Sequence, residues 1–301
     1  MKASADRYAI VIAYFLIYVV WGSTYYFIGV ALEGFPTFLL GALRFSVAGM
    51  MQLWMCHLRG EKVFRPALVR RSAVSGIVLL FVDMAVIMLA QRYVSSSLVA
   101  IVASSIAIWI TLFDIPMWRR NFRHPSMLWG LLLGFAGVSM LYMEQLGGES
   151  TLSAHSEYGI LILVAGCISW SLGTLYVKYR SSAVEEVNGF VDSAWQMLFA
   201  SLMFWICFGL SGEWAATNLS ETPFTAWLAL LYLIVFGSLL AYSAYVWLLK
   251  VRPATEVATH AYVNPFVAVI IGCLCGEEIT TVQLVGLAVI LGSVLLVNKK
   301  Q

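Results

Sequence analysis

Ten apolar runs, each about as long as a membrane-spanning helix, divide this sequence from one end to the other. A helix needs roughly 20 mostly apolar residues to cross the hydrocarbon core of a bilayer. The runs lie at about residues 9–30, 35–56, 72–90, 95–116, 127–143, 157–177, 190–210, 225–249, 255–275 and 281–297. The connections between them are too short for a soluble domain. The sequence therefore predicts an all-α polytopic protein of ten helices, with the lipid bilayer as its surroundings.

The composition excludes a water-soluble fold. Of the 301 residues, 61% are hydrophobic and 11% are charged, whereas soluble domains carry about a quarter charged residues. The net charge of +2 is small, and the basic residues form short clusters between apolar runs. This pattern argues against a nucleic-acid partner.

The basic clusters predict the orientation in the membrane. Short cytoplasmic loops are enriched in Lys and Arg, and every alternate connection here is basic. These connections and the two chain ends carry Lys2, Arg7, Arg59, Lys62, Arg65, Arg70, Arg71, Arg119, Arg120, Arg123, Lys178, Arg180, Lys250, Arg252, Lys299 and Lys300. The opposite connections are acidic and hold one basic residue, Arg92. We expect both termini in the cytoplasm and a location in the cytoplasmic (inner) membrane.

The two halves of the chain, residues 1–149 and 150–301, carry similar short sequence motifs. Trp21-Gly22-Ser23-Thr24-Tyr25 in the first helix resembles the stretch around Trp170 and Gly173 in the sixth. A repeat of five helices must place its second copy upside down in the bilayer. Inverted repeats are common in secondary transporters, whose substrate sites lie near the midplane where the copies meet.

Few charged or strongly polar side chains fall inside the predicted helices. Arg44 lies midway along the second helix, Asp83 lies near the centre of the third, and Gln196 follows Asp192 by one turn in the seventh. A charge at the bilayer centre costs roughly 2.5–3.5 kcal/mol on insertion scales. Arg44 and Asp83 therefore either form an ion pair or a carbonyl-bound anchor, or they contact substrate.

The ninth helix carries a polar stripe that is the best candidate for a cavity wall. Glu256, His260 and Asn264 recur at helical spacing, with Tyr262 on a neighbouring face and Pro265 next in the chain. His260 is either a neutral histidine hydrogen-bonded across helices or a site residue, and Glu256 is either hydrated at the interface or involved in coupling. A kink at Pro265 suits a site wall or a gate.

Aromatic residues deep in the helices or beside small residues are candidates to line a pocket for organic solutes. Helix packing is the alternative role for each of them. These residues are Trp21, Tyr25, Trp109, Trp170, Tyr176, Tyr242, Tyr245 and Tyr262.

Several short sequence motifs resemble those of the drug/metabolite transporter superfamily, specifically its ten-helix EamA-type exporters. They are the opening Trp21-Gly22-Ser23-Thr24-Tyr25, Leu43-Arg44-Phe45, Tyr262-Val263-Asn264-Pro265 and Gly276-Glu277-Glu278. The resemblance implies two inverted five-helix repeats and a central cavity between helices one, three, four, six, eight and nine. It also implies export of amino acids, related metabolites or drugs. Ala107 departs from the family pattern, which has a proline there in the fourth helix.

We therefore expect a secondary carrier that works by alternating access on a small-molecule substrate, as a monomer or homodimer. No nucleotide-binding loop or cofactor motif is present in the sequence. Energy then comes from an ion or substrate gradient, and proton coupling through Asp83, His260 or Glu256 is a hypothesis. The alternatives are an intramembrane enzyme, which lacks a metal-ligand or nucleophile motif, and a sensor without transport activity.

Overall fold

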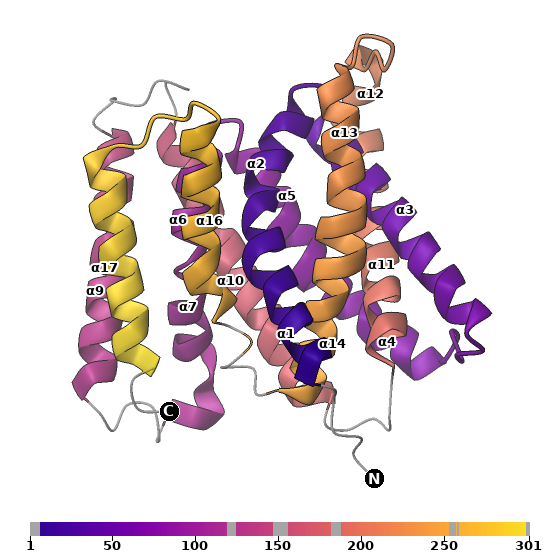
Figure 1. Ribbon diagram of the computed structural model, residues 1–301, viewed down its shortest axis with the longest axis horizontal. Coiled ribbons are helices and arrows are strands. Elements are labelled where there is room, and N and C mark those ends of the chain that lie inside the picture. Colours follow the sequence, from indigo (N-terminus) through magenta and orange to yellow (C-terminus); the bar gives the residue numbers. More distant parts are fainter. Residues whose placement is uncertain are drawn as a thin grey trace.

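The computed structural model describes residues 7–118, 125–146, 156–181, 188–252, 257 and 259–298. Across these residues the chain contains helices and no strand, and a helix lies in each of the ten predicted ranges (Figure 1). Eight of these spans are long and apolar enough to cross a membrane, and the apolar parts of the last two, Val263–Leu274 and Thr281–Ser293, are shorter. The predicted all-α polytopic membrane architecture is confirmed.

The spans of the first half consist of α1 (Arg7–Phe15), η1 (Leu16–Val20) and α2 (Trp21–Leu32); α3 (Thr37–Leu58); α4 (Pro66–Ser75), η2 (Gly76–Phe81) and α5 (Val82–Ala90); α6 (Ser96–Ala103), α7 (Ile106–Phe113) and the short η3 (Ile115–Met117); and α9 (Pro125–Leu146). Those of the second half consist of α10 (Ser156–Ser181); α11 (Gly189–Ser211), followed by the short α12 (Glu213–Ala216); α13 (Phe224–Tyr232), η4 (Leu233–Tyr242) and α14 (Ser243–Val251); α16 (His260–Leu274); and α17 (Thr281–Asn298).

In the described part of the chain, three spans contain a π-helical segment near their middle. η1 ends immediately before Trp21, η2 ends two residues before Asp83, and η4 ends at Tyr242. In a π-helix the hydrogen bonds run from i to i+5, and such segments are frequent at functional sites. Trp21 and Asp83 line the central pocket described below, and Tyr242 packs beside it against Trp21.

The fourth span is interrupted between α6 and α7, although Ala107 replaces the proline of the family pattern. The Ser104 hydroxyl donates to the Ile101 carbonyl at 2.6 Å, and the Ser105 hydroxyl accepts from the Trp109 indole at 3.3 Å. Serine hydroxyls offer the backbone an alternative to the helical ladder. A pair of serines therefore marks this break in the absence of proline.

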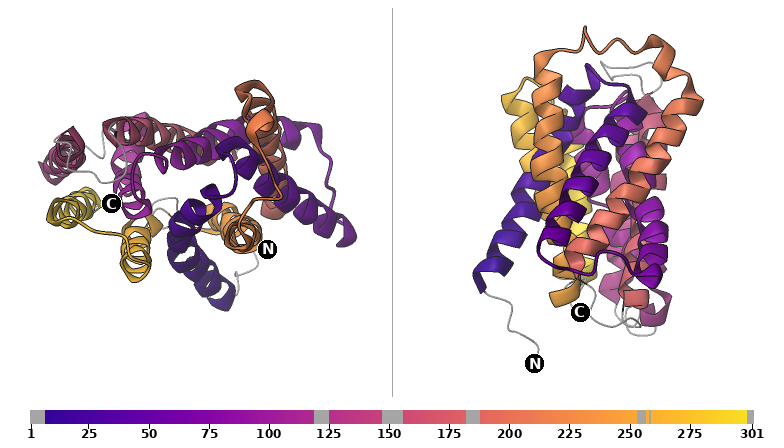
Figure 2. Two further views of the ribbon diagram at one scale, coloured as in Figure 1. Left: turned by 90° about the horizontal axis from the view of Figure 1, so that it is seen from above. Right: turned by 90° about the vertical axis from the view of Figure 1, so that its right-hand side faces the viewer.

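Two helix pairs pack along their lengths at opposite ends of the molecule. α9 packs on α17 at one end, and α3 packs on α11 at the other (Figures 1 and 2). At Gly41 of α3, an added Cβ would lie 2.5 Å from the ring of Phe204 in α11. Small residues allow such close approach of helices in a membrane. The first span and α10 lie between these pairs.

Side-chain contacts join the connections that the charge pattern places on one side of the membrane. We call it the acidic side, and the opposite side, which carries Arg59, Lys62 and Arg65, the basic side. On the acidic side, Arg92 pairs with Glu213 at 3.4 Å, and Glu277 accepts from the Ser96 hydroxyl at 2.5 Å. On the basic side, the Trp195 indole donates to the Val63 carbonyl at 2.7 Å. These contacts agree with the predicted alternation of the spans.

Candidate functional site

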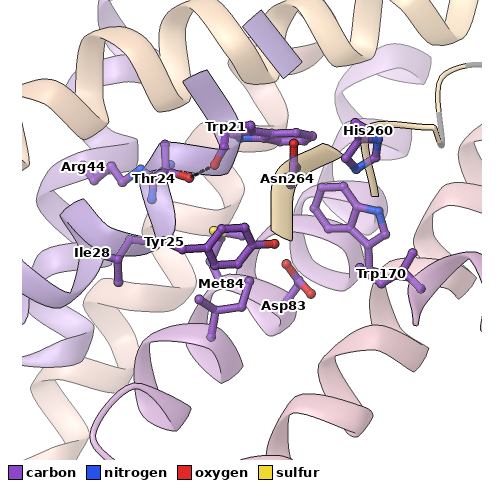
Figure 3. A pocket seen from close by; sticks show the side chains of 12 residues that line it. Trp21, Thr24, Tyr25, Ile28, Arg44, Asp83, Met84, Trp170, His260 and Asn264 are labelled. Carbon is purple, nitrogen blue, oxygen red and sulfur yellow. Dashed lines mark hydrogen bonds between the residues drawn. The ribbon is translucent and has the colours of Figure 1, made fainter. Parts of the chain in front are cut away.

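A buried pocket lies where the first span meets helices from both halves of the chain (Figure 3). Its cavity volume of about 40 Å³ holds about three water molecules. An organic solute therefore enters only when lining side chains move. The lining consists of Trp21, Thr24, Tyr25, Ile28, Arg44, Asp83, Met84, Ile87, Ile106, Trp170, His260 and Asn264.

The Arg44 guanidinium is hydrogen-bonded through Nε, but its Nη1 has no partner among the described residues. The side chain is 2% exposed, its Nε donates to the Ser238 hydroxyl at 2.8 Å, and its guanidinium carbon lies 4.9 Å from the Phe45 ring centroid. Its Nη1 is buried and has no hydrogen-bond partner among the described residues. A buried polar group without a partner is costly, and a charged one more so.

Asp83 is the carboxylate of the pocket and is 4% exposed. In the part of the chain that the structure describes, the ion pairs are Arg71–Asp192, Lys250–Asp192 and Arg92–Glu213. Arg44 and Asp83 take part in none of these pairs. An ion pair between Arg44 and Asp83 is therefore absent from the described residues, although both side chains line the same pocket.

Five rings form what we call the aromatic cluster: Trp21, Trp170, Tyr242, Tyr245 and His260. The Trp21 ring centroid lies 5.6 Å from that of Trp170, 5.1 Å from that of Tyr245 and 5.3 Å from that of His260. The Tyr242 ring lies 6.4 Å from Trp21. These distances are typical of interacting aromatic pairs. Trp21 and Trp170, which occupy similar words in the two halves, thus meet at the centre of the molecule.

His260 hydrogen-bonds within its own turn. Its Nδ1 lies 2.9 Å from the Val257 carbonyl oxygen, so this contact does not cross between helices. Asn264, one turn further along α16, connects two spans. With its amide nitrogen placed to donate, it reaches the carbonyls of Ile17 at 2.9 Å and Tyr18 at 2.8 Å. These carbonyls belong to η1, so Asn264 ties α16 to the π segment before Trp21.

A buried polar network joins three spans between the aromatic cluster and the basic side. Asp192 in α11 accepts from Arg71 at 2.6 Å, from the Ser72 hydroxyl at 2.7 Å and from the Gln196 amide at 3.0 Å. The Tyr242 hydroxyl donates to the Gln196 side-chain oxygen. Gln196 therefore connects the ion pair to the aromatic cluster. We call the set Arg71, Ser72, Asp192, Gln196 and Lys250 the Asp192 network.

Arg71 corrects one expectation from the sequence. The charge pattern places it in the connection before the third span, but it lies inside α4, which begins at Pro66. Its side chain is buried because Asp192, 121 residues later, supplies the counter-charge.

The remaining candidate residues lie elsewhere. The Trp109 ring packs edge-to-face on Phe135 of α9 at 5.1 Å and does not line the pocket. Tyr176 is half-buried on α10 and also lies outside the lining. Tyr262 lies in α16, Pro265 is a buried residue inside the same helix, and Glu256 lies outside the described residues.

The pocket lining also contains residues that the sequence reasoning missed. They are Thr24, Ile28, Met84, Ile87 and Ile106. Thr24 and Ile28 follow Trp21 by three and seven residues, and Ile87 follows Asp83 by four, which are the spacings of one helix face. Extending each predicted site residue along its helix face would have found these three. Among the described residues, no group of three or more His, Cys, Asp or Glu side chains is placed to hold a metal.

Comparison with known proteins finds a matching family model, similar proteins and a similar solved structure. The model of the EamA-like transporter family matches residues 8–143 and again residues 157–299. The uncharacterized inner membrane transporter YedA of Escherichia coli is 34% identical over 295 residues, which cover 95% of this chain and 89% of YedA. An uncharacterized transporter of Archaeoglobus fulgidus is 25% identical over 287 residues, which cover 94% of each chain. A solved crystal structure shares the fold at 19% identity, with a TM-score of 0.65 and 98% of both chains covered.

Proposed function

Because this chain belongs to the EamA-like transporter family, we propose that it is a secondary carrier that exports small amphipathic metabolites, such as amino acids, by alternating access. The observation that carries this proposal is the central pocket. Its lining side chains are mostly buried, they come from both halves of the chain, and they include Arg44 and Asp83, which lie within the second and third spans. Intramembrane charges that face a cavity are typical of substrate pathways.

The proposed mechanism has the two halves, residues 1–149 and 150–301, rock against each other as inverted repeats. The contact between Trp21 and Trp170 supports this division, since the two rings meet from similar words of the two halves. In inverted-repeat transporters the site lies at the repeat interface near the midplane.

The Asp192 network is the proposed closure on the cytoplasmic side. It lies toward the basic side, which the excess of Lys and Arg assigns to the cytoplasm. Opening the pocket to the cytoplasm then requires separation of α4 from α11. Tyr242 connects this closure to the aromatic cluster through Gln196, so a solute that moves the cluster also disturbs the closure.

Protons are the proposed coupling ion, with Asp83, His260 and Glu256 as the candidate groups. Asp83 and His260 line the pocket. Neutral substitutions at all three positions are expected to abolish the dependence of transport on a pH gradient. Unchanged dependence would contradict proton coupling and leave the substrate gradient as the source of energy.

The test of the carrier function is counterflow into proteoliposomes that hold the purified protein. Labelled amino acids and labelled amphipathic cations are offered separately, with and without an imposed pH gradient. We expect saturable counterflow that unlabelled solute competes away. The matched control is the Trp21→Ala/Trp170→Ala double variant, which removes two pocket walls and is expected to lower counterflow strongly.

Two results would contradict the carrier function. Absence of counterflow with every solute, from protein that is folded and correctly inserted, would favour a sensor without transport activity. Chemical conversion of a solute by the purified protein would favour an intramembrane enzyme.

A further inference from the structure

The helix pair α9 and α17, far from the central pocket, contains a glutamate without a counter-charge among the described residues. Glu144 lies near the acidic-side end of α9, and its Oε1 accepts from the Thr280 hydroxyl at 2.5 Å. Its Oε2 is buried and has no hydrogen-bond partner in the described part of the chain. The ion pairs there involve the carboxylates of Asp192 and Glu213. A buried carboxylate oxygen that meets no donor is unfavourable.

A second oxygen without a donor lies on α17. Gln283 is 6% exposed, and its side-chain Oε1 is buried without a partner among the described residues. The backbone N–H of Gln283 donates to the Thr280 hydroxyl at 3.1 Å. The same hydroxyl donates to Glu144. Thr280 therefore connects the residues that carry the two unpartnered oxygens.

The packing of α9 on α17 shows that Glu144 and Gln283 face each other. The two helices lie side by side (Figure 1), and added Cβ atoms at three glycines would lie 2.7–2.9 Å from the opposite helix. The contacts pair Gly134 with Ser293, Gly137 with Ile290, and Leu141 with Gly286. They follow one face of each helix in antiparallel order. The next positions along these faces are Glu144 and Gln283, at the acidic side.

Two facing oxygens without a donor suit a positive ion. Hard cations prefer carboxylate and carbonyl oxygens as ligands. The carboxyl end of α9 and the amino end of α17 lie together here, so their opposed helix dipoles largely cancel. The Glu144 carboxylate therefore sets the sign of the local charge. One carboxylate balances one positive charge, whereas Ca²⁺ sites commonly contain several carboxylates.

We propose that Glu144 and Gln283 bind a small monovalent cation, Na⁺, between α9 and α17 on the acidic side. The carboxylate of Glu144 supplies the counter-charge, and the side-chain oxygen of Gln283 supplies a neutral ligand. Because α9 belongs to the first half of the chain and α17 to the second, the ion holds the two halves together on this side. The site is separate from the central pocket and does not depend on the proposed carrier function.

The primary test measures the response of the unmodified protein to Na⁺. Purified protein in detergent is heated in sodium chloride or in choline chloride of equal ionic strength, so that charge screening is the same. A ligand that binds the folded state raises the midpoint of thermal unfolding. We expect a saturable rise of roughly 2–4 °C at about ten times the dissociation constant. Binding of radioactive Na⁺ in equilibrium dialysis should saturate over the same concentrations.

Three variants assign the ion to this site. Glu144→Gln removes the charge at nearly constant size and is expected to abolish both the Na⁺-dependent rise and the binding. Glu221→Gln is the matched control, because Glu221 is an exposed carboxylate of the acidic side that accepts from Asn218 at 2.7 Å. Asp83→Asn removes the carboxylate of the central pocket. The response to Na⁺ should persist in both of these variants.

A fourth variant tests whether the two side chains share one ion. Gln283→Glu places a second carboxylate opposite Glu144, and a pair of carboxylates favours a divalent cation such as Ca²⁺. We expect Ca²⁺ to raise the unfolding midpoint of Gln283→Glu and to leave that of the unmodified protein unchanged. A purely structural role of Gln283 would not produce this new response.

Several outcomes would overturn the cation site. One is a midpoint that does not respond to Na⁺, and another is an equal response in Glu144→Gln. Loss of the response in Asp83→Asn would place the ion in the central pocket instead. Stabilisation by acid alone, abolished in Glu144→Gln, would show that the two oxygens share a proton. A Gln283→Glu variant that responds to neither Na⁺ nor Ca²⁺ would show that the two side chains do not share an ion.

Discussion

At the scale of single residues, Gly237 provides the space that the Arg44 guanidinium occupies. A Cβ added at Gly237 would lie 2.9 Å from Nη2 of Arg44 and 3.1 Å from the methyl group of Thr24. Both neighbours line the pocket. The absence of a side chain at position 237 therefore decides where the positive charge of the pocket lies.

Gly237→Ala is expected to displace this charge without removing it. Alanine has a higher helix propensity than glycine, so the backbone tolerates the change while the guanidinium must shift. We expect this displacement to weaken substrate binding by roughly tenfold, which is the cost of losing one charge-assisted hydrogen bond. The measurement is substrate affinity from the concentration dependence of counterflow.

Gly209→Ala is the control for this prediction. Apart from the chain neighbours and backbone of its own helix, no atom of the described residues lies within 4 Å of a Cβ at Gly209, so the affinity of this variant should equal that of the unmodified protein. An unchanged affinity in Gly237→Ala would show that the position of the guanidinium does not matter for binding.

At the scale of helices, the Asp192 network holds α4 and α11 together through a buried ion pair. Asp192→Asn removes the charge that compensates Arg71. Removal of one partner of a buried pair costs about 3–5 kcal/mol, because the remaining charge stays buried. We expect a loss of that order in the free energy of unfolding, measured by titration from mild detergent into SDS.

The exposed pair between Arg92 and Glu213 is the matched comparison for Asp192→Asn. The Arg92 side chain is 46% exposed, and exposed pairs contribute about 0–1 kcal/mol. Glu213→Gln should therefore change the free energy of unfolding by less than about 1 kcal/mol. A similar small effect for Asp192→Asn would contradict the structural role of the network.

The contact between α10 and the third span depends on Gly173. A Cβ at this position would lie 2.7 Å from the Cβ and 3.0 Å from the Cα of Leu79 in η2. Because part of this contact is backbone, a flexible side chain cannot relieve it. Gly173→Ala is expected to lower the free energy of unfolding by about 1–3 kcal/mol, the usual cost of overpacking.

Gly292→Ala provides the control, since outside its own helix no atom of the described part of the chain lies within 4 Å of a Cβ at Gly292. The two variants make the same chemical change in the helices of a single protein. Equal unfolding free energies for the two variants would show that α10 and η2 move apart to accommodate the added methyl group at no cost.

At the scale of the whole molecule, the orientation in the membrane determines which side of the pocket faces the cytoplasm. We expect the basic side to be cytoplasmic, and single cysteines at Lys62 and Ser220 test this. A membrane-impermeant maleimide added to intact cells should label Ser220→Cys, and should label Lys62→Cys only after the membrane is opened.

The labelling must start from a variant without cysteines, because Cys273 and Cys275 are exposed. Replacement of all five native cysteines by serine supplies this background. Labelling of Lys62→Cys in intact cells would invert the assignment and place the Asp192 network on the outer side.

The architecture of this protein follows from local properties of the sequence. The need of each helix for about 20 apolar residues, and the retention of Lys and Arg on one side, act on one span at a time. Hydropathy therefore locates the ten helical ranges, and a helix lies in each of them, although several helices extend beyond their predicted range. The similar sequence motifs around Trp21 and Trp170 likewise mark both residues as site candidates from the sequence alone.

Contacts between distant spans were decided only by the tertiary structure. The sequence marks Arg44, Asp83, Arg71 and Asp192 equally as polar residues in or near apolar helices. Arg71 and Asp192 pair at a sequence separation of 121 residues, whereas Arg44 and Asp83 line one pocket without an ion pair among the described residues. The same holds for Tyr245, which joins the aromatic cluster, and Trp109, which packs against α9. Membrane insertion depends on the composition of each span, but the partner of a buried charge depends on how the spans pack together, and that is set by the fold as a whole.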